Sequence, residues 1–190
     1  GTEWLVDNSK PVLPTQDLTL VGRHNVANAL VSLALLKKVG IDYSKSLEAL
    51  KAYNGLTHRC QVVADKRSIK WVNDSKATNA DAAEKALLTY KNIHWIAGGV
   101  AKAGGIEPLL PLMDRVAKTY LIGEATDEFA FQLGDHPFEA CGDLAAAIAK
   151  AYPEVKDTKL ATKQKRLGAL IDIDSKENPA RGAEVLEQLI

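Results

Sequence analysis

The sequence predicts an α/β fold in which a mostly parallel sheet follows a smaller amino-terminal part. Beyond residue 58, short apolar runs alternate with amphipathic helical segments at the spacing of βαβ units. A glycine-rich run at residues 98–105 directly follows one apolar run, which is where open α/β sheets place their ligands. An Asn-Gly break separates this region from the amino-terminal part, whose pattern differs. We therefore expect two domains, at residues 1–57 and 58–190.

The amino-terminal domain is expected to contain short antiparallel strands and two helices. Apolar stretches at residues 4–6, 12–13 and 18–21 are separated by turn-forming residues, which favours strands joined by turns. At residues 24–39 apolar side chains recur at nearly helical spacing, and a glycine ends the run. A second, shorter helix is expected at residues 44–53.

The carboxy-terminal domain begins with a predicted strand pair and continues as alternating strands and helices. The expected strands are residues 60–63, 69–72, 93–97, 119–122, 138–140 and 167–173. The expected helices are residues 79–88, 107–113, 125–133, 143–151 and 179–189, the last with a proline in its first turn. This alternation is the pattern of helices packed on a mostly parallel sheet.

Composition narrows the classes of function. Hydrophobic residues make up 46% and charged residues 25% of the 190 residues, which is the balance of a soluble globular protein. Lys plus Arg and Asp plus Glu number 24 each, so no net charge attracts nucleic acid or a membrane surface, and neither is expected as a partner. No apolar run reaches the roughly 20 residues of a membrane helix and no signal peptide opens the chain, so we expect a cytoplasmic protein. The chain starts at Gly1 without a methionine and reads as an excised piece.

The glycine-rich run at residues 98–105 matches neither common nucleotide motif. A P-loop requires Gly-Lys-Ser/Thr, and a dinucleotide fingerprint requires GxGxxG; both are absent. Lys102 within the run suits a carboxylate or a phosphate, although a lysine solvated on a loop is the simpler reading of this residue by itself.

Residues 73–79 form a polar cluster between a predicted strand and a predicted helix. Thr78 or Asn79 can cap the helix and Asp74 can form a turn. The same segment can be a binding site, because a helix amino terminus together with Lys76 attracts an anion, and Asp74 can accept hydrogen bonds from ribose hydroxyls. The residues alone leave both readings open.

Two further segments carry side chains suited to a nucleotide. Asn25 and Asn28 lie three residues apart at the start of a predicted helix, and an asparagine amide matches the donor–acceptor edge of adenine. Arg59 offers a fork of donors that fits phosphate. Taken singly, these are also what a helix start and a surface arginine look like.

The motifs occur together in a recognisable order. Gly-x-His-Asn-x-x-Asn stands at residues 22–28, Gly-Leu-x-His-Arg at residues 55–59 and Asn-Asp-Ser-Lys-Ala-Thr-Asn at residues 73–79. In this order they resemble the Mur ligases, and the third motif is similar to that of the members that add D-glutamate to UDP-N-acetylmuramoyl-L-alanine. Other Mur ligases and folylpolyglutamate synthases differ at that motif. The resemblance extends at least from Trp4 to about Leu144.

The resemblance implies a place in a larger protein. Residues 1–57 would be the end of the central, ATP-binding domain and residues 58–190 a Rossmann-like carboxy-terminal domain. The P-loop and the Mg²⁺ ligands would precede Gly1, in an amino-terminal half that this chain lacks. We therefore expect the chain to be inactive on its own.

The resemblance also implies roles for individual residues. Asn25, Asn28, Arg59 and Asp74 would contact ATP, whereas Lys76, Thr78 and Lys102 would hold the carboxylates of D-glutamate. No catalytic residue and no metal ligand is expected within this chain. In the full enzyme ATP would phosphorylate the alanyl carboxylate, and the amine of D-glutamate would attack the acyl phosphate, in a step of peptidoglycan precursor synthesis.

One segment departs from the family pattern. Residues 171–178 lack the Ser-Pro-Ala pattern and the phenylalanine expected after the last core strand, whereas Arg-Gly at residues 181–182 fits. Two alternatives therefore stay open: a different Mur-type or folylpolyglutamate-type ligase, or a non-catalytic Rossmann-like module that binds a nucleotide or a protein.

Overall fold

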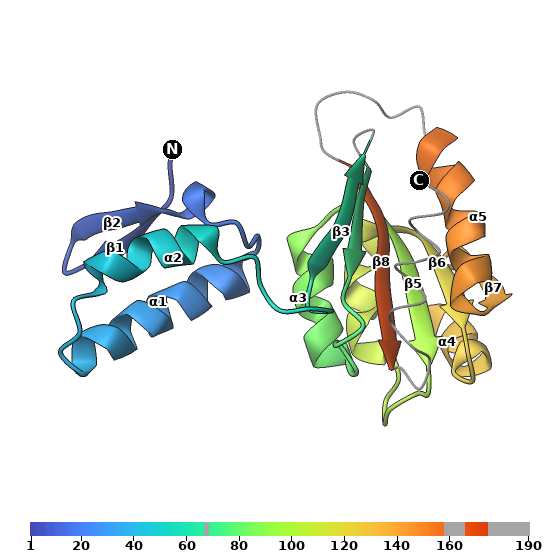
Figure 1. Cartoon of the computed structure of the whole chain (residues 1–190). Coiled ribbons are helices and arrows are strands. Elements are labelled where there is room, and N and C mark those ends of the chain that lie inside the picture. The colour runs from blue at the N-terminus through green and yellow to red at the C-terminus, as the bar shows by residue number, and fades with distance from the viewer. Residues whose placement is uncertain (67–68, 158–165, 175–190) are drawn as a thin grey trace. The chain divides into compact units, whose positions relative to one another are not determined.

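The chain folds into two compact units, Gly1–Gly55 and Leu56–Ile190, as seen in the computed structural model of Figure 1. The structure describes residues 1–66, 69–157 and 166–174. The division falls close to the boundary expected after residue 57. Whether the first unit is the end of an ATP-binding domain stays a prediction.

The first unit consists of a β-hairpin and two α-helices. Its elements are β1 (Trp4–Asp7), β2 (Lys10–Pro14), the 3₁₀ turns η1 (Thr15–Asp17) and η2 (Tyr43–Lys45), and helices α1 (Arg23–Lys38) and α2 (Ser46–Ala52). The two predicted helices and the first two strands are confirmed. The strand predicted at residues 18–21 is wrong: the sheet here has only two strands, and the Thr19 hydroxyl instead donates to the backbone oxygen of Lys51 at 2.5 Å.

A small apolar core holds this unit together. Leu5 and Leu13 come from the hairpin, and Ala29 and Leu33 come from α1, one helical turn apart, so that one face of the helix covers the hairpin. Each of the four side chains is at most 7% exposed. Such burial is the main favourable contribution to folding, at about 25 cal/mol per Å² of apolar surface.

The second unit is built on a six-stranded sheet in the order β3-β4-β8-β5-β6-β7. The strands are β3 (Gln61–Lys66), β4 (Ile69–Asn73), β5 (Ile93–Gly99), β6 (Val116–Ile122), β7 (Phe138–Gly142) and β8 (Arg166–Asp174). Only β3 runs antiparallel to its neighbour; β4 to β8 are parallel. The predicted strand pair and mostly parallel sheet are therefore confirmed.

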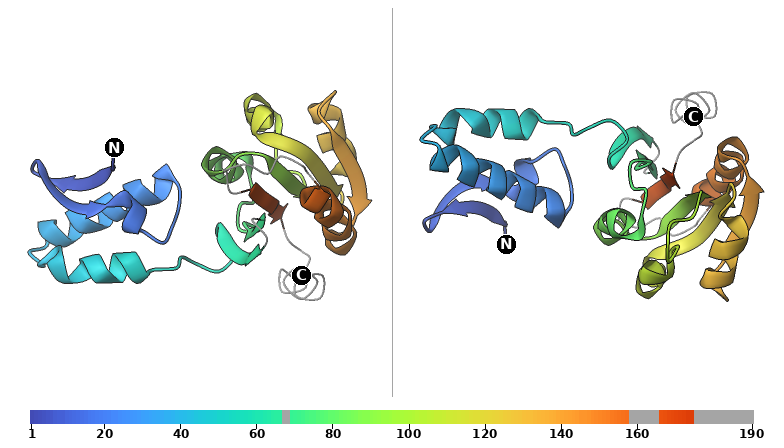
Figure 2. Two further views of the ribbon diagram at one scale, coloured as in Figure 1. Left: turned by 90° about the horizontal axis from the view of Figure 1, so that it is seen from above. Right: turned by 90° about the horizontal axis from the view of Figure 1, so that it is seen from below.

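Helices cover both faces of this sheet (Figures 1 and 2). Helix α3 (Ala80–Thr89), the 3₁₀ segment η3 (Glu107–Arg115) and α4 (Thr126–Leu133) share one apolar core with the sheet. Helix α5 (Leu144–Asp157) packs on a second core. None of the helices in the described part of the chain combines the length and the apolar character of a membrane span.

Three predicted helices differ from the structure or lie outside its described residues. The segment predicted as a helix at residues 107–113 is a 3₁₀ helix, because Pro111, inside it, supplies no backbone N–H for an α-helical bond. Helix α5 extends past residue 151, where its end was expected, to Asp157. The helix predicted at residues 179–189 lies outside the described residues.

Strands β5 and β6 come very close together at Gly98. A β-carbon added there would lie 1.9 Å from the backbone oxygen of Ile122, and the residue has a φ of +152°. Only glycine fits, because the contacting atom belongs to the backbone and cannot rotate away. The end of β5 and the loop that follows it are therefore fixed against β6.

We predict that Gly98→Ala lowers the free energy of unfolding by about 3 kcal/mol, the upper range for overpacking a core. Gly142→Ala is the matched control, because Gly142 also has a positive φ, +80°, but no atom lies within 4 Å of the added carbon. That control should lose only about 1 kcal/mol. Equal losses in denaturant titrations would contradict the steric explanation.

Candidate functional site

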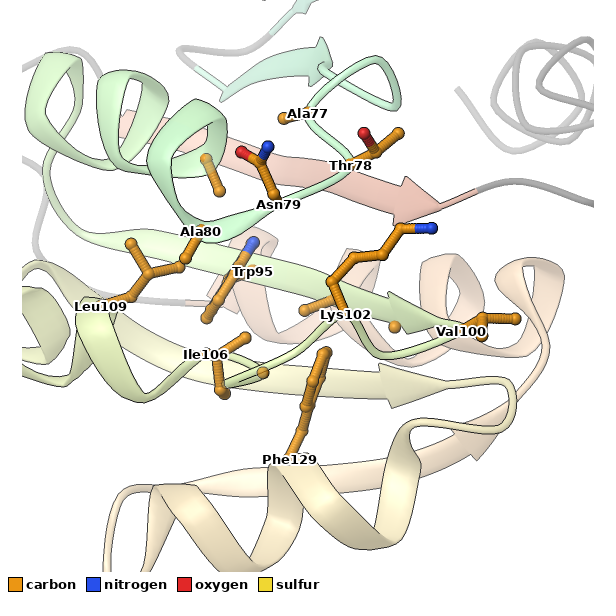
Figure 3. Close-up of a pocket in the computed structure, with 14 residues that line it drawn as sticks. Ala77, Thr78, Asn79, Ala80, Trp95, Val100, Lys102, Ile106, Leu109 and Phe129 are labelled. Carbon is orange, nitrogen blue, oxygen red and sulfur yellow. The ribbon is translucent and has the colours of Figure 1, made fainter.

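A pocket opens at the carboxyl edge of the parallel sheet (Figure 3). Its rim comes from two segments: the start of α3, with Thr78 and Asn79, and the glycine-rich loop after β5, with Lys102. Trp95 and Phe129 are among its inner, apolar walls. The loops after β4 and β5 reach the same pocket because both strands are parallel to β8 and end at the same edge.

The start of α3 gives the pocket a positive electrostatic potential. Asn79 caps the helix, its side-chain oxygen accepting from the backbone N–H of Ala82 at 2.9 Å. The sequence left Thr78 and Asn79 as alternative caps, and the structure selects Asn79. Thr78 is exposed beside it, with its hydroxyl available at the pocket rim. The unpaired N–H groups and the dipole of a helix amino terminus favour an anion.

The glycine-rich loop is held in place by one glutamine of α4. Gln132 accepts a hydrogen bond from the backbone N–H of Ile106 at 2.8 Å, and it donates to the backbone oxygen of Gly104 at 3.3 Å. The backbone N–H of Gly105 donates to the backbone oxygen of Lys102 at 2.8 Å, and this bond closes a turn within the loop. Figure 3 shows Lys102 extending from this loop toward the segment that carries Thr78.

Arg59 lies in a strained turn at the beginning of the second unit. The residues on either side of it, His58 and Cys60, have φ values of 64° and 44°, in the left-handed region that non-glycine residues rarely adopt. Asp74 stabilises the turn, its carboxylate accepting from the backbone N–H of Cys60 at 2.8 Å. The backbone oxygen of His58 in turn accepts from the N–H of Lys76 at 3.0 Å. The exposed Arg59 is thus presented by a rigid support.

Asp74 is a buried carboxylate, only 4% exposed. Burial raises the pKa of Asp74, because the charged form loses its hydration, while the hydrogen bond from Cys60 and the charge of Arg59 partly oppose the shift. The buried carboxylate of Asp74 therefore supports the turn from which the guanidinium of Arg59 faces solvent.

The structure brings together some of the residues that the sequence singled out. Thr78 and Lys102 line the same pocket, whereas Lys76, on the same segment as Thr78, is exposed and does not line it. Asn25 and Asn28 belong to the first unit and Arg59 and Asp74 to the second. In the first unit, the Asn25 amide donates to the backbone oxygen of Val21 at 2.9 Å. Their proposed roles in binding stay predictions.

Sequence reasoning missed three residues of the pocket region. Trp95 and Phe129 were interpreted only as members of a buried strand and a helix, and Gln132 was not singled out. One signal was present for Trp95: it lies two residues before Ala97, so both side chains face the same side of a strand that ends at the glycine-rich loop. No local signal marks Gln132, whose contacts lie 26 and 28 residues away in sequence.

The fold and the pocket define an α/β domain with a pocket at the carboxyl edge of a parallel sheet. Residues 58–161 match the family described as Mur ligase, glutamate ligase domain. The chain belongs to the Mur ligase family.

Similar proteins agree with this assignment. The chain is 64% identical over 156 residues to the UDP-N-acetylmuramoylalanine–D-glutamate ligase of Vibrio atlanticus, covering 78% of this chain and 35% of that protein. It is 50% identical over 134 residues to the ligase of the same name from Mesorhizobium japonicum, covering 70% and 29%. The chain therefore spans about a third of the length of the curated relatives it matches.

Solved structures show the same fold at low sequence identity. The UDP-N-acetylmuramate–alanine ligase of Thermotoga maritima superposes with a TM-score of 0.66 and 18% identity, over 90% of this chain and 39% of that one. A folylpolyglutamate synthase of Mycobacterium tuberculosis gives 0.65 and 18%, over 95% and 42%. These similarities confirm the predicted fold, Rossmann-like and mostly parallel.

We predict that Asp74→Asn keeps or raises stability at neutral pH. The asparagine oxygen can still accept from the N–H of Cys60, and the cost of burying a charge disappears. Since the folded pKa of Asp74 lies above its ordinary value, the folded state retains this proton at higher pH than the unfolded state. The parent is thus penalised at neutral pH, and its stability recovers as the pH falls through the folded pKa.

The measurement is the free energy of unfolding of both proteins at several pH values. The advantage of the variant should shrink toward acidic pH. A variant that is less stable at neutral pH, or a difference that does not change with pH, would contradict this account of Asp74.

A separate prediction concerns the support of the glycine-rich loop. At Gly105, with a φ of +54°, an added β-carbon would lie 2.4 Å from Oε1 and 2.7 Å from Nε2 of Gln132. Gly105→Ala should therefore displace Gln132 and cost about 2 to 3 kcal/mol of unfolding free energy. Gly104→Ala, with a φ of +85° and no atom within 4 Å, should cost only about 1 kcal/mol. Similar values for both variants would show that Gln132 does not restrain the loop.

Proposed function

We propose that this chain is part of an ATP-dependent ligase that joins D-glutamate to UDP-N-acetylmuramoyl-L-alanine in peptidoglycan precursor synthesis. The observation that carries the proposal is the pocket in which Thr78 and Lys102 meet the amino terminus of α3. A cation, a hydroxyl and a helix amino terminus suit a carboxylate. The choice of D-glutamate is supported by the names of relatives that are up to 64% identical to this chain.

The role of this chain in the reaction is to position the amino acid. Lys102 and Thr78 hold a carboxylate of D-glutamate, and Lys76, exposed on the same segment, adds positive charge to the approach. Holding the amine in line with an activated carboxylate removes an entropic barrier, worth up to about 7 to 11 kcal/mol in well-oriented systems. None of these residues needs to transfer a proton.

ATP supplies the phosphoryl group that activates the alanyl carboxylate. The residues present fit parts of a nucleotide: Arg59 offers its donors to phosphate from a rigid turn, and Asn25 and Asn28 offer amides to adenine. Asp74 is proposed to contact the ribose, although one of its oxygens already accepts from Cys60.

The described part of the chain contains no group of three or more His, Cys, Asp or Glu side chains that could hold a metal ion. By resemblance to the family, we assign the Mg²⁺ ligands and the P-loop to the amino-terminal half of the complete ligase. The complete ligase, with its amino-terminal half, is proposed to act in the cytoplasm, where its nucleotide substrates occur.

The alternative functions differ from the proposed one either in the substrates that are joined or in having no catalytic activity. A folylpolyglutamate-type ligase has the same fold, but its similarity to this chain is only 18%. A non-catalytic binding module would share the pocket and would not couple it to ATP. Phosphate release by the complete protein separates the proposed ligase from both alternatives, because only the proposed ligase requires both UDP-N-acetylmuramoyl-L-alanine and D-glutamate.

We predict that Lys102→Ala in the complete protein raises the KM for D-glutamate by at least about tenfold, since a hydrogen bond to a charged group contributes about 1.5 to 3 kcal/mol. The control is Lys91→Ala: Lys91 is also exposed, but it precedes β5 at the opposite edge of the sheet. The assay is D-glutamate-dependent phosphate release. An unchanged KM with activity retained would show that Lys102 is a solvated loop residue.

A further inference from the structure

The indole N–H of Trp95 is a buried donor with no acceptor. Trp95 is 1% exposed, and within the described part of the chain its Nε1 makes no hydrogen bond. Buried tryptophan N–H groups usually find a partner, because an unpaired donor costs about 1 to 3 kcal/mol. An unpaired donor in a well-packed core therefore requires an explanation.

The position of this donor connects it with the pocket. Trp95 lies on β5, on the sheet face covered by α3, and it lines the pocket together with Thr78 and Lys102. Figure 3 shows its nitrogen pointing toward Asn79, at the amino terminus of α3. The indole N–H and the helix amino terminus thus direct positive potential at the same part of the pocket.

The described residues that line the pocket include no acidic acceptor. Its other inner walls are apolar side chains such as Ala83, Leu109 and Phe129, and no Asp or Glu is among the described residues that line it. The amide oxygen of Asn79 is already used to cap α3. A molecule that enters the pocket can supply the missing acceptor for Trp95.

We propose that the Trp95 Nε1–H donates a hydrogen bond to a carboxylate oxygen of the amino-acid substrate, an inference that rests on the proposed function. An indole nitrogen is a donor only, so it pairs with a carboxylate and repels an ammonium group. Together with the amino terminus of α3 it draws a carboxylate inward. The amine is consequently oriented toward the mouth of the pocket, where the activated carboxylate must approach.

The first test uses the chain as it stands, labelled with ¹⁵N and titrated with D-glutamate. The protein has three tryptophans, Trp4, Trp71 and Trp95, so its NMR spectrum contains three indole N–H resonances. We expect the Trp95 resonance to shift downfield, together with the backbone amides of Thr78 and Lys102. Glutarate, which has both carboxylates and no amine, should shift the same indole resonance.

The outcomes separate this inference from the proposed function. If the amides of Thr78 and Lys102 respond and the Trp95 indole does not, the inference is overturned and the glutamate pocket stands. If no resonance of the pocket responds, the pocket is not a glutamate site, and both proposals fall. No variant is needed for this decision.

A variant pair then tests whether the donor matters for affinity. Trp95→Phe keeps an aromatic ring and removes the N–H; Trp71→Phe is the matched control, because Trp71 is also 1% exposed but packs in the core on the other face, against Tyr152. We expect Trp95→Phe to weaken D-glutamate binding about tenfold, as for loss of a hydrogen bond to a charged group. Trp71→Phe should change it less than twofold. Equal effects of the two variants would overturn the inference by showing a general response to a smaller ring.

Discussion

The parallel pairing of β4 and β5 with the strand between them, β8, is the constraint on which the pocket depends. Parallel strands end at the same edge of a sheet, so the segment after β4 and the glycine-rich loop after β5 meet although about 25 residues separate them in sequence. If β8 did not pair with both β4 and β5, the segments that carry Thr78 and Lys102 would not be held at the same pocket. The close contact of Gly98 with β6 then fixes the point at which the glycine-rich loop leaves the sheet.

Around the turn of Arg59, the cations face solvent and the Asp74 carboxylate is buried. Lys76, Lys102 and Arg59 are exposed, where they remain hydrated and can attract anions. Asp74 is buried, and it supports the turn of Arg59 through the backbone of Cys60. Burying Asp74 costs stability, but it keeps a negative charge away from the surface that an anionic ligand approaches.

Much of the fold could be predicted because the local patterns agree with the tertiary structure. The strand at Ile93–Gly99 is apolar on both faces, as expected when helices cover both sides of a parallel sheet. The failed strand at residues 18–21 shows the limit: a short apolar stretch becomes a strand only if another strand offers hydrogen bonds, and no local pattern reveals that. Lys102 and Thr78 could be found from motifs, whereas Gln132 and the unpaired N–H of Trp95 depend on contacts that only the folded chain defines.

The strained turn around Arg59 also has a consequence for the entropy of binding. Two non-glycine residues in the left-handed region hold the backbone on each side of the arginine, at a cost of about 1 kcal/mol or more each. That cost is met during folding, so the backbone has little freedom left to lose when a ligand binds. Glycine at His58 or Cys60 would relieve the strain and increase the number of backbone conformations of the unbound turn. The molecule thus exchanges some stability for an arginine whose position is already set in the unbound state.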